Sequence, residues 1–339
     1  MPNMTHAHLG FLGIGPQTGS DLRASKIAAA YWARYHSLVF EEKRGIVFDP
    51  TSGSSVAQGM SQGNYDIQVK SMLEASTEGP LVPLLHSVLG GAVTTATTGT
   101  TGKKHTIPMA EVVPTSGRMT FEQRLGTMAK SKRCNGIVKH FGFDATAPDY
   151  AKVACDAVAS KAEILTTPST PTLASPLSVL SQKATTFTFD SLTTWGVRNF
   201  KWDIARILDE DDFDVVDQQR RDAEYGDLIV TVEAECVLPD LEIYERFLGG
   251  NGLTAPSDTE AYFACSIETQ RNDLIPGGTA RHGIKINLPA LGLTAGPPTE
   301  ARGREKILTT LQGQATYSVA SSKAVDVEVV NSVSSYALP

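Results

Sequence analysis

Apolar and polar residues alternate at every second position over long stretches of this chain, and this feature constrains its fold most. Between residues 226 and 235, Val230 and Val232 share one face of an extended segment, whereas Thr231 and Glu233 share the other. Half-buried antiparallel strands produce this pattern, because successive side chains face opposite sides of a sheet. Similar alternation occurs in segments 66–70, 118–123, 136–143, 185–190, 262–268, 283–291 and 324–331. The chain also contains 34 threonines, and β-branched residues favour strands. The sequence predicts a mainly β protein.

Two short segments have helical spacing instead. Residues 240–250 begin with Asp240, a suitable N-cap, and Gly249 suits the position that follows a helix. Residues 79–91 carry prolines near their start, apolar residues on one helical face and the same Leu-Gly-Gly ending. We therefore expect two short helices among the strands.

The two predicted helices mark an internal repeat. Each half of the chain has the order strand, short helix, Gly-Gly, strand, Gly-led strand and closing strand. In the first half these segments are 65–69, 79–91, 119–123, 135–143 and 150–159. In the second half they are 226–232, 240–250, 263–268, 282–291 and the pair 315–319 and 324–330. The order of elements predicts two tandem β-sandwich or barrel units, each with a short flanking α-helix.

A stretch rich in Pro, Ser and Thr separates the two halves and is typical of a linker. We therefore predict four regions along the chain. They are an N-terminal arm over residues 1–40, a first β-domain over 41–165, a linker over 166–183 and a second β-domain over 184–339.

Composition limits the classes of partner. Asp and Glu number 37 against 30 Lys and Arg, giving a net charge of −7 without a dense basic run. Tight nucleic-acid binding is not expected, because it depends on clustered basic residues that neutralise phosphates. The longest near-apolar stretch, 81–93, is shorter than the roughly 20 residues of a membrane span, and no secretion signal opens the chain. The four cysteines lie far apart, which favours reduced, buried thiols over a zinc site.

Motifs for catalysis or metal binding are weak. Ser61 lies in a Gly-x-Ser-x-Gly sequence, but a predicted strand follows where a nucleophile elbow needs a helix, so a polar loop is favoured. Residues 13–19 lack the dinucleotide-binding glycine spacing and are expected to form part of a loose N-terminal arm. The acidic run 209–217 lacks the glycine and the final glutamate of an EF-hand loop, so we expect a solvated loop. The sequence predicts no enzyme, no cofactor and no metal site.

Three segments resemble the tail tube proteins of long-tailed bacteriophages. Residues 224–250, EYGDLIVTVEAECVLPDLEIYERFLGG, are similar to the strand and following helix of that family. Residues 283–291, followed by 315–331, resemble its C-terminal strand and closing hairpin. Residues 136–163 resemble the strand–turn–strand that closes its first half. The resemblance covers about residues 40–331.

The resemblance implies a structural role in the virion. Tail tube proteins form rings of six β-sandwich units, each with a flanking helix, and the rings stack into a hollow tube through which the genome passes during ejection. Two units in one chain then imply a trimeric ring with pseudo-sixfold symmetry. The implied partners are further copies of the chain, the tape-measure protein, the tail terminator and tail-tip or baseplate proteins. DNA would pass through the lumen without tight binding, no membrane is involved, and the chain would reside in the host cytoplasm during assembly.

The polar loop 208–222 is a candidate for contacts between stacked rings, because its acidic and basic residues are segregated. As contact residues we predict Asp211, Asp212, Arg220 and Arg221, with a plain surface loop as the alternative. An acidic excess also suits a lumen wall that repels phosphates, although it equally serves solubility. Two other functions remain open: another self-assembling decoration or carbohydrate-binding β protein, and a serine hydrolase that uses Ser61.

Overall fold

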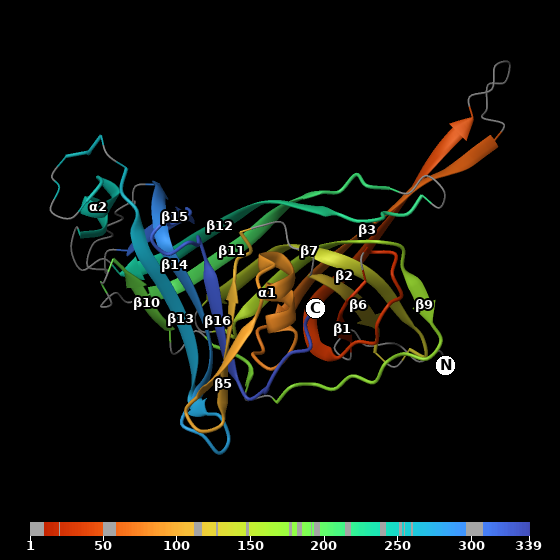
Figure 1. Ribbon diagram of the computed structural model, residues 1–339, viewed down its shortest axis with the longest axis horizontal. Coiled ribbons are helices and arrows are strands. Elements are labelled where there is room, and N and C mark those ends of the chain that lie inside the picture. Colours follow the sequence, from red (N-terminus) through yellow and green to blue (C-terminus); the bar gives the residue numbers. More distant parts are fainter. Residues whose placement is uncertain are drawn as a thin grey trace.

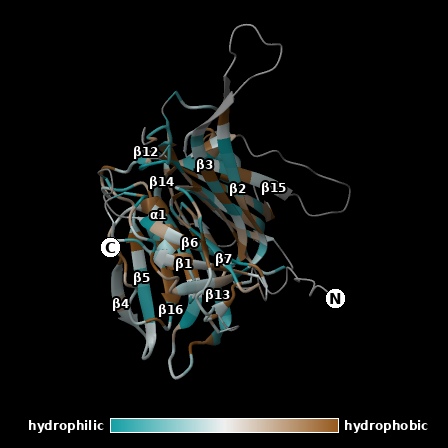
Figure 2. Ribbon diagram, turned by 90° about the vertical axis from the view of Figure 1, so that its right-hand side faces the viewer, coloured by the Kyte–Doolittle hydropathy of each residue, from teal (hydrophilic) through white to brown (hydrophobic). Residues whose placement is uncertain are grey.

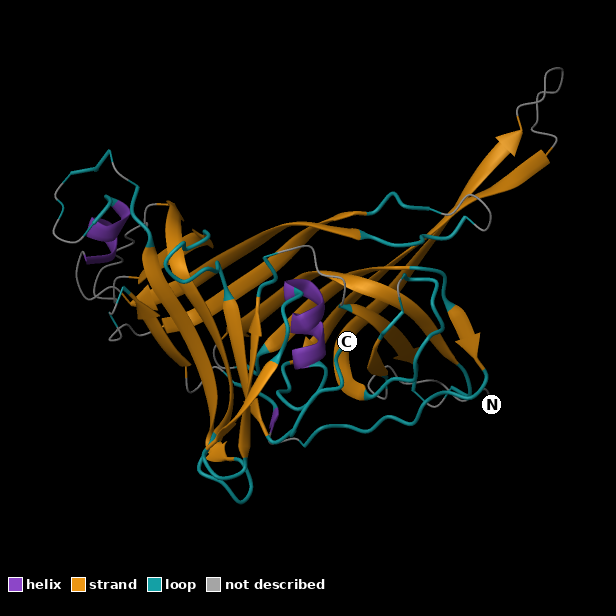
Figure 3. Ribbon diagram, viewed as in Figure 1, coloured by secondary structure: helices purple, strands orange, loops and turns teal. Residues whose placement is uncertain are grey.

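The structure is a computed structural model in which antiparallel strands predominate, as the alternation predicts (Figures 1 and 3). It describes residues 10–19, 21–49, 59–111, 117–126, 128–146, 149–175, 178–181, 185–190, 192, 197–213, 218–237, 242–250, 253, 255–258, 260–295 and 308–339. The side chains of residues 47–62 and 308 are outside this description. The prediction of a mainly β protein is confirmed.

Six strands of the N-terminal half close into a barrel. These strands are β1 (Phe11–Pro16), β2 (Tyr31–Asp49), β3 (Gly59–Glu74), β6 (Arg118–Arg124), β7 (Ser131–Thr146) and β8 (Lys152–Ala159). They pair in the order β6-β1-β2-β3-β8-β7, and β7 pairs back to β6. Helix α1 (Leu81–Leu89), a hairpin of β4 (Thr94–Thr98) and β5 (Gly102–Pro108), and the short β9 (Glu163–Leu165) complete this first unit.

The C-terminal half repeats the same strand order. Its elements are β10 (Thr185–Phe189), β11 (Val197–Asp209), β12 (Glu224–Val237), α2 (Glu242–Phe247), β13 (Phe263–Leu274), β14 (Arg281–Ala295), β15 (Leu308–Ala315) and β16 (Asp326–Asn331). The pairing order is β10-β13-β14-β15-β12-β11, which matches the first unit except that the described residues show no pairing between β10 and β11. The predicted order of elements is thus confirmed. The closing strand differs from its expected position at 315–319, since β15 ends at Ala315.

β-bulges at equivalent positions allow the two units to be aligned residue by residue. β2 is bulged between Tyr35 and Ser37 and again after Arg44. β11 is bulged between residues 197 and 199 and again after Arg206. Both pairs of bulges differ by 162 residues, so Arg206 occupies in the second unit the position that Arg44 occupies in the first. A bulge fixes how a strand bends, and its repetition at two positions supports a duplicated backbone as well as a duplicated order.

The two units form one continuous sheet. β7 of the first unit pairs with β11 of the second over Asn199–Ala205, and β16 at the C-terminal end pairs with both β14 and β5. The predicted linker also packs on the first unit, where Leu180 is fully buried and its backbone N–H donates to the Ala75 carbonyl at 2.9 Å. Strand pairing and the packed linker therefore hold the two units together.

The structure differs from the expected loose arm over residues 1–40. β1 lies between β2 and β6 in the closed barrel, and its Leu12 and Ile14 side chains are fully buried. The segment 13–19 begins within this strand, although its glycines suggested a loop. Gly13 fits because a Cβ there would lie 2.5 Å from the Ala29 side chain, so close packing rather than flexibility accounts for this glycine. Residues 1–9 of the expected arm lie outside the described residues.

One hydrophobic core extends under both units. Trp202 of β11 stacks on Phe141 and Phe143 of β7, with ring centroids 5.5 and 5.3 Å apart, so the junction between the units is itself part of the core. All nine residues of α1 are buried. Along β2, hydrophobic and hydrophilic residues follow one another in short runs rather than at every second position (Figure 2).

Candidate functional site

The largest candidate surface is the outer face of an eight-stranded sheet. Its strands follow the order β2-β3-β8-β7-β11-β12-β15-β14, four from each unit, and the β7–β11 pair joins the two halves. The inner face carries core residues such as Val69, Phe141, Trp202 and Val232. The outer face has two equivalent halves, which the duplication dictates.

Polar residues predominate on this outer face, although Val39, Met72 and Ile229 are also exposed there. Cross-strand partners share a face, and the pairings align the following residues on it: Ser37, Glu41, Lys43, Asp66, Gln68, Lys70, Glu74, His140, Asp144, Thr146, Lys152, Asp156, Asn199, Lys201, Asp203, Thr231, Glu233, Glu235, Thr310, Gln312 and Gln314. Eight carboxylates stand among them against four lysines, so this face is acidic.

A charged cluster lies on this face at the junction of the two units. Asp203 of β11 accepts hydrogen bonds from His140 Nε2 at 3.0 Å and forms an ion pair with Lys201 at 2.8 Å. Partial burial opposes ionisation of Asp203, but the hydrogen bonds from His140 and Lys201 outweigh it, so its pKa lies below its ordinary value. The Asp203 carboxylate in turn raises the pKa of Lys201. Asp203 and Lys201 therefore stay charged near neutral pH.

The sequence pattern did not identify the strand that carries this cluster. Residues 198–207 contain Phe200, Trp202 and Ile204 at alternate positions, which is the signal of a half-buried strand. Their intervening residues Lys201 and Asp203 form the outer face. This alternation is sufficient to predict β11 as a strand, whereas its pairing with β7 is a tertiary feature.

The four predicted contact residues separate into two environments. Arg220 is 2% exposed; its Nη1 lies 2.8 Å from the Asp66 carboxylate, and its guanidinium lies over the Phe213 ring. Asp211 and Arg221 are exposed, Asp212 is half-buried, and Asp212 and Arg221 lie 3.6 Å apart. Arg220 thus fastens the loop to the first unit of its own chain, while the other three remain accessible at the surface.

Substitution of Arg220 is expected to separate these roles. Arg220→Met removes the partner of Asp66 and should destabilise the fold by about 2 kcal/mol, since a partly buried carboxylate is left without its counter-ion. Arg221→Met is the matched control and should change stability by less than about 0.5 kcal/mol. Chemical denaturation of both variants measures the difference, and equal stability of the two would contradict the assignment.

Ser61 lies within β3, where its backbone pairs with Val47 of β2 in an antiparallel hairpin. A nucleophile elbow requires a sharp turn between a strand and a helix, and this extended backbone does not provide one. The side chain of Ser61 lies outside the described residues. The predicted polar loop around Ser61 is wrong, because the backbone of Gly59–Glu74 forms strand β3.

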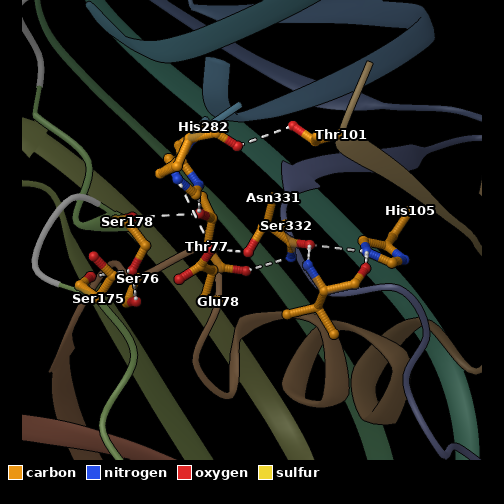
Figure 4. A network of polar contacts seen from close by, with 12 residues as sticks. Ser76, Thr77, Glu78, Thr101, His105, Ser175, Ser178, His282, Asn331 and Ser332 are labelled. Atoms are coloured by element: carbon orange, nitrogen blue, oxygen red, sulfur yellow. Dashed lines mark hydrogen bonds and ion pairs between the residues drawn. The ribbon is translucent and has the colours of Figure 1, made fainter. Parts of the chain in front are cut away.

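A buried polar network joins the two units near α1 (Figure 4). Thr77 Oγ1 lies 3.0 Å from His282 Nδ1, and His282 Nε2 lies 3.8 Å from the Glu78 carboxylate. Asn331 Nδ2 donates to the Thr77 carbonyl at 2.6 Å, and its Oδ1 lies 3.0 Å from His105 Nε2. Thr77 and His282 are at most 1% exposed, so a substrate does not reach this hydroxyl and imidazole. We interpret the network as a clamp that holds the C-terminal strand.

The prediction of buried, reduced thiols is confirmed for Cys134, Cys155, Cys236 and Cys265. Burial raises the pKa of each thiol, to about 12 for Cys236 and Cys265. Within the described residues, no group of three or more His, Cys, Asp or Glu side chains is placed to hold a metal ion. Among the same residues, neither helix has the length and apolar character that a membrane span requires.

Comparison with protein-family models and with curated proteins finds no match to this chain.

Proposed function

We propose that this chain is a tail tube protein of a long-tailed bacteriophage, and that its copies form stacked rings around a channel for the viral genome. The observation that carries the proposal is the eight-stranded sheet built from two equivalent four-stranded halves. Such a sheet is an arc of repeating units, and repetition of one rotation closes an arc into a ring. With two units per chain, three chains supply six units, which supports a trimeric ring.

The outer face of the eight-stranded sheet is the wall of the channel in this proposal. Its carboxylates outnumber its lysines, and their repulsion of phosphates favours passage of DNA over retention. Short polar side chains, such as those of Ser37, Thr146 and Thr231, project only a short distance from the wall. The core lies on the opposite face, so most apolar side chains of the sheet stay buried, and Val39, Met72 and Ile229 are exposed on the wall.

The remaining partners and the location follow from this role. We propose that rings assemble in the host cytoplasm on the tape-measure protein, end at a tail terminator and attach to tail-tip or baseplate proteins in the virion. Asp211, Asp212 and Arg221 are accessible for contacts between rings. Arg220 acts indirectly, by holding the loop that carries them.

Electron microscopy of the purified protein tests the proposal. We expect rings or tubes with a central hole in negative stain, and a mass of three chains for the smallest closed ring by mass photometry. A ring of six chains would overturn the trimer. A compact monomer at every concentration, including in the presence of the tape-measure protein, would overturn the tube itself.

A further inference from the structure

The C-terminal end of α1 is closed by an arginine from the other unit. Arg206 of β11 donates from Nε to the Val88 carbonyl at 2.8 Å and from Nη2 to the Leu89 carbonyl at 3.1 Å. The last carbonyls of a helix lack intrahelical partners and carry partial negative charge, so a cation there is favourable. Arg206 is 7% exposed and also lies over the Tyr225 ring. The hairpin of β11 and β12 therefore completes the first unit.

The same hairpin fills a groove beside α1. Tyr225 of β12 donates a hydrogen bond to the Ser87 carbonyl and packs against Ile137 of β7. Asp222, just before β12, forms an ion pair with Arg118 at the start of β6. The groove is thus bounded by the end of α1, the start of β6 and the middle of β7.

The second unit has the equivalent groove beside α2. The Leu248 carbonyl accepts from the Ser257 N–H, just as the Leu89 carbonyl accepts from Ala110. The bulges in β7 and β14 differ by 155 residues, so Leu293 corresponds to Val138, next to Ile137. A cavity of about 440 Å³ lies here, with Phe247, Leu248, Tyr262, Leu293 and Gln314 among its lining residues. The space that the β11–β12 hairpin fills in the first unit is thus a cavity in the second.

Aromatic side chains at this second groove are accessible. Tyr244 is 42% exposed, Phe247 39% and Tyr262 50%, whereas every residue of α1 is buried. The contrast follows from packing, because α1 has the β11–β12 hairpin against it and α2 has no equivalent hairpin among the described residues. An apolar patch of this kind beside a cavity is typical of an interface.

The first unit carries the hairpin that matches this groove. Arg44 of β2 has the same position relative to the bulges as Arg206, and it also lies over a tyrosine ring of the adjacent strand, 5.7 Å from the centre of Tyr65. The Arg44 side chain is exposed, and among the described residues it forms no hydrogen bond or ion pair. The β2–β3 hairpin projects from the body at the opposite end from α2 (Figure 1), so it does not reach the groove of its own chain.

We infer that the β2–β3 hairpin of a second copy of this chain occupies the groove beside α2, where its Arg44 donates to the Phe247 and Leu248 carbonyls. The contact inside one chain, between the β11–β12 hairpin and α1, is the template for the contact between chains. The inference rests on the proposed self-assembly and names the surfaces that carry it. Each chain offers one hairpin and one groove, which is a heterologous contact that propagates or closes into a ring.

Complementary variants test the contact. Arg44→Ala damages the hairpin and leaves the groove intact, whereas Phe247→Glu damages the groove and leaves the hairpin intact. Each variant alone is expected to self-associate roughly 10- to 100-fold more weakly than the wild type by mass photometry, because a desolvated charged hydrogen bond or an apolar contact is lost. An equimolar mixture should form dimers that grow no further, since it contains one intact combination of surfaces. Arg34→Ala, a change of another exposed arginine on β2, is the matched control and should assemble as the wild type does.

The outcomes distinguish this contact from the ring itself. Normal rings from Arg44→Ala, or a mixture without dimers, would overturn the contact and leave the ring proposal standing. If the wild type stays monomeric, the ring proposal fails, and a chain with both Arg44→Cys and Phe247→Cys tests the contact by itself with a short bismaleimide. Covalent multimers support the contact in that case, because the four native cysteines are buried and the two positions lie at opposite ends of one chain; their absence would overturn it.

Discussion

Val230→Asp is expected to prevent folding of the second unit. Val230 is 2% exposed in the core face of β12, opposite Ile204 of β11. A carboxylate at this position loses its water among apolar core residues, so it either stays charged at high cost or takes up a proton. We expect a loss of more than about 4 kcal/mol, which approaches the whole stability of many domains. Because the β11–β12 hairpin also closes the groove beside α1, the first unit should lose stability as well.

Ile229→Asp is the matched control for this prediction. Ile229 is the neighbouring residue on β12, is 37% exposed and faces the polar side of the sheet. We expect a change within about 1 kcal/mol there, because the carboxylate keeps its water. Urea unfolding and the yield of soluble protein measure both variants. A folded, assembling Val230→Asp protein would mean that the facing of β12 is wrong.

Acidification from pH 7 to pH 5 is expected to destabilise the protein through His86. This side chain lies in α1, is 1% exposed, and burial lowers its pKa from 6.5 to about 4. Between these two values the unfolded chain binds a proton that the folded chain does not, so stability falls as the pH falls. The loss reaches about 2 kcal/mol at pH 5 and about 3 kcal/mol below pH 4. Burial also lowers the pKa of His105 and His282, which adds to the loss with the same sign.

Replacement of His86 separates its contribution to the pH dependence of stability from that of the other titrating groups. His86→Met places an apolar side chain of similar length in the core and removes the titrating imidazole. Its stability should depend less on pH between 7 and 5 than that of the wild type, by about 2 kcal/mol. His36→Gln alters an exposed histidine and should leave the pH profile unchanged. A His86→Met profile that parallels the wild type would exclude His86 as the source.

Local pattern was sufficient to predict strands with a polar and an apolar face. The alternation of Val230 and Val232 with Thr231 correctly assigned the two faces of β12. The pattern was not sufficient to predict β1, because Gly13 and Gly15 are typical of a loop. In the structure, Leu12 and Ile14 of this strand are buried in the barrel. The predicted segments also do not include β11, the strand that joins the units.

The candidate surfaces were less predictable than the strands. The charges of residues 208–222 pointed to a contact loop, but the side chain of Arg220 turns inward to Asp66, a residue more than 150 positions earlier in the chain. Nothing near Arg44 in the sequence indicates a role. The role proposed for Arg44 follows from the equivalent bulges in β2 and β11 and from the helix carbonyls that accept hydrogen bonds from Arg206.

The sequence by itself determined that the chain is mainly β, that its elements repeat in order and that its net charge is negative. These properties depend on local periodicity, on composition and on the order of segments, all of which are present in one dimension. The tertiary structure alone decided that the units share one sheet, which face of it is acidic and which groove stays open. Those features depend on which strand edges meet, and strand pairing joins residues far apart in the chain, such as Asp203 and Gly142, that no local pattern relates.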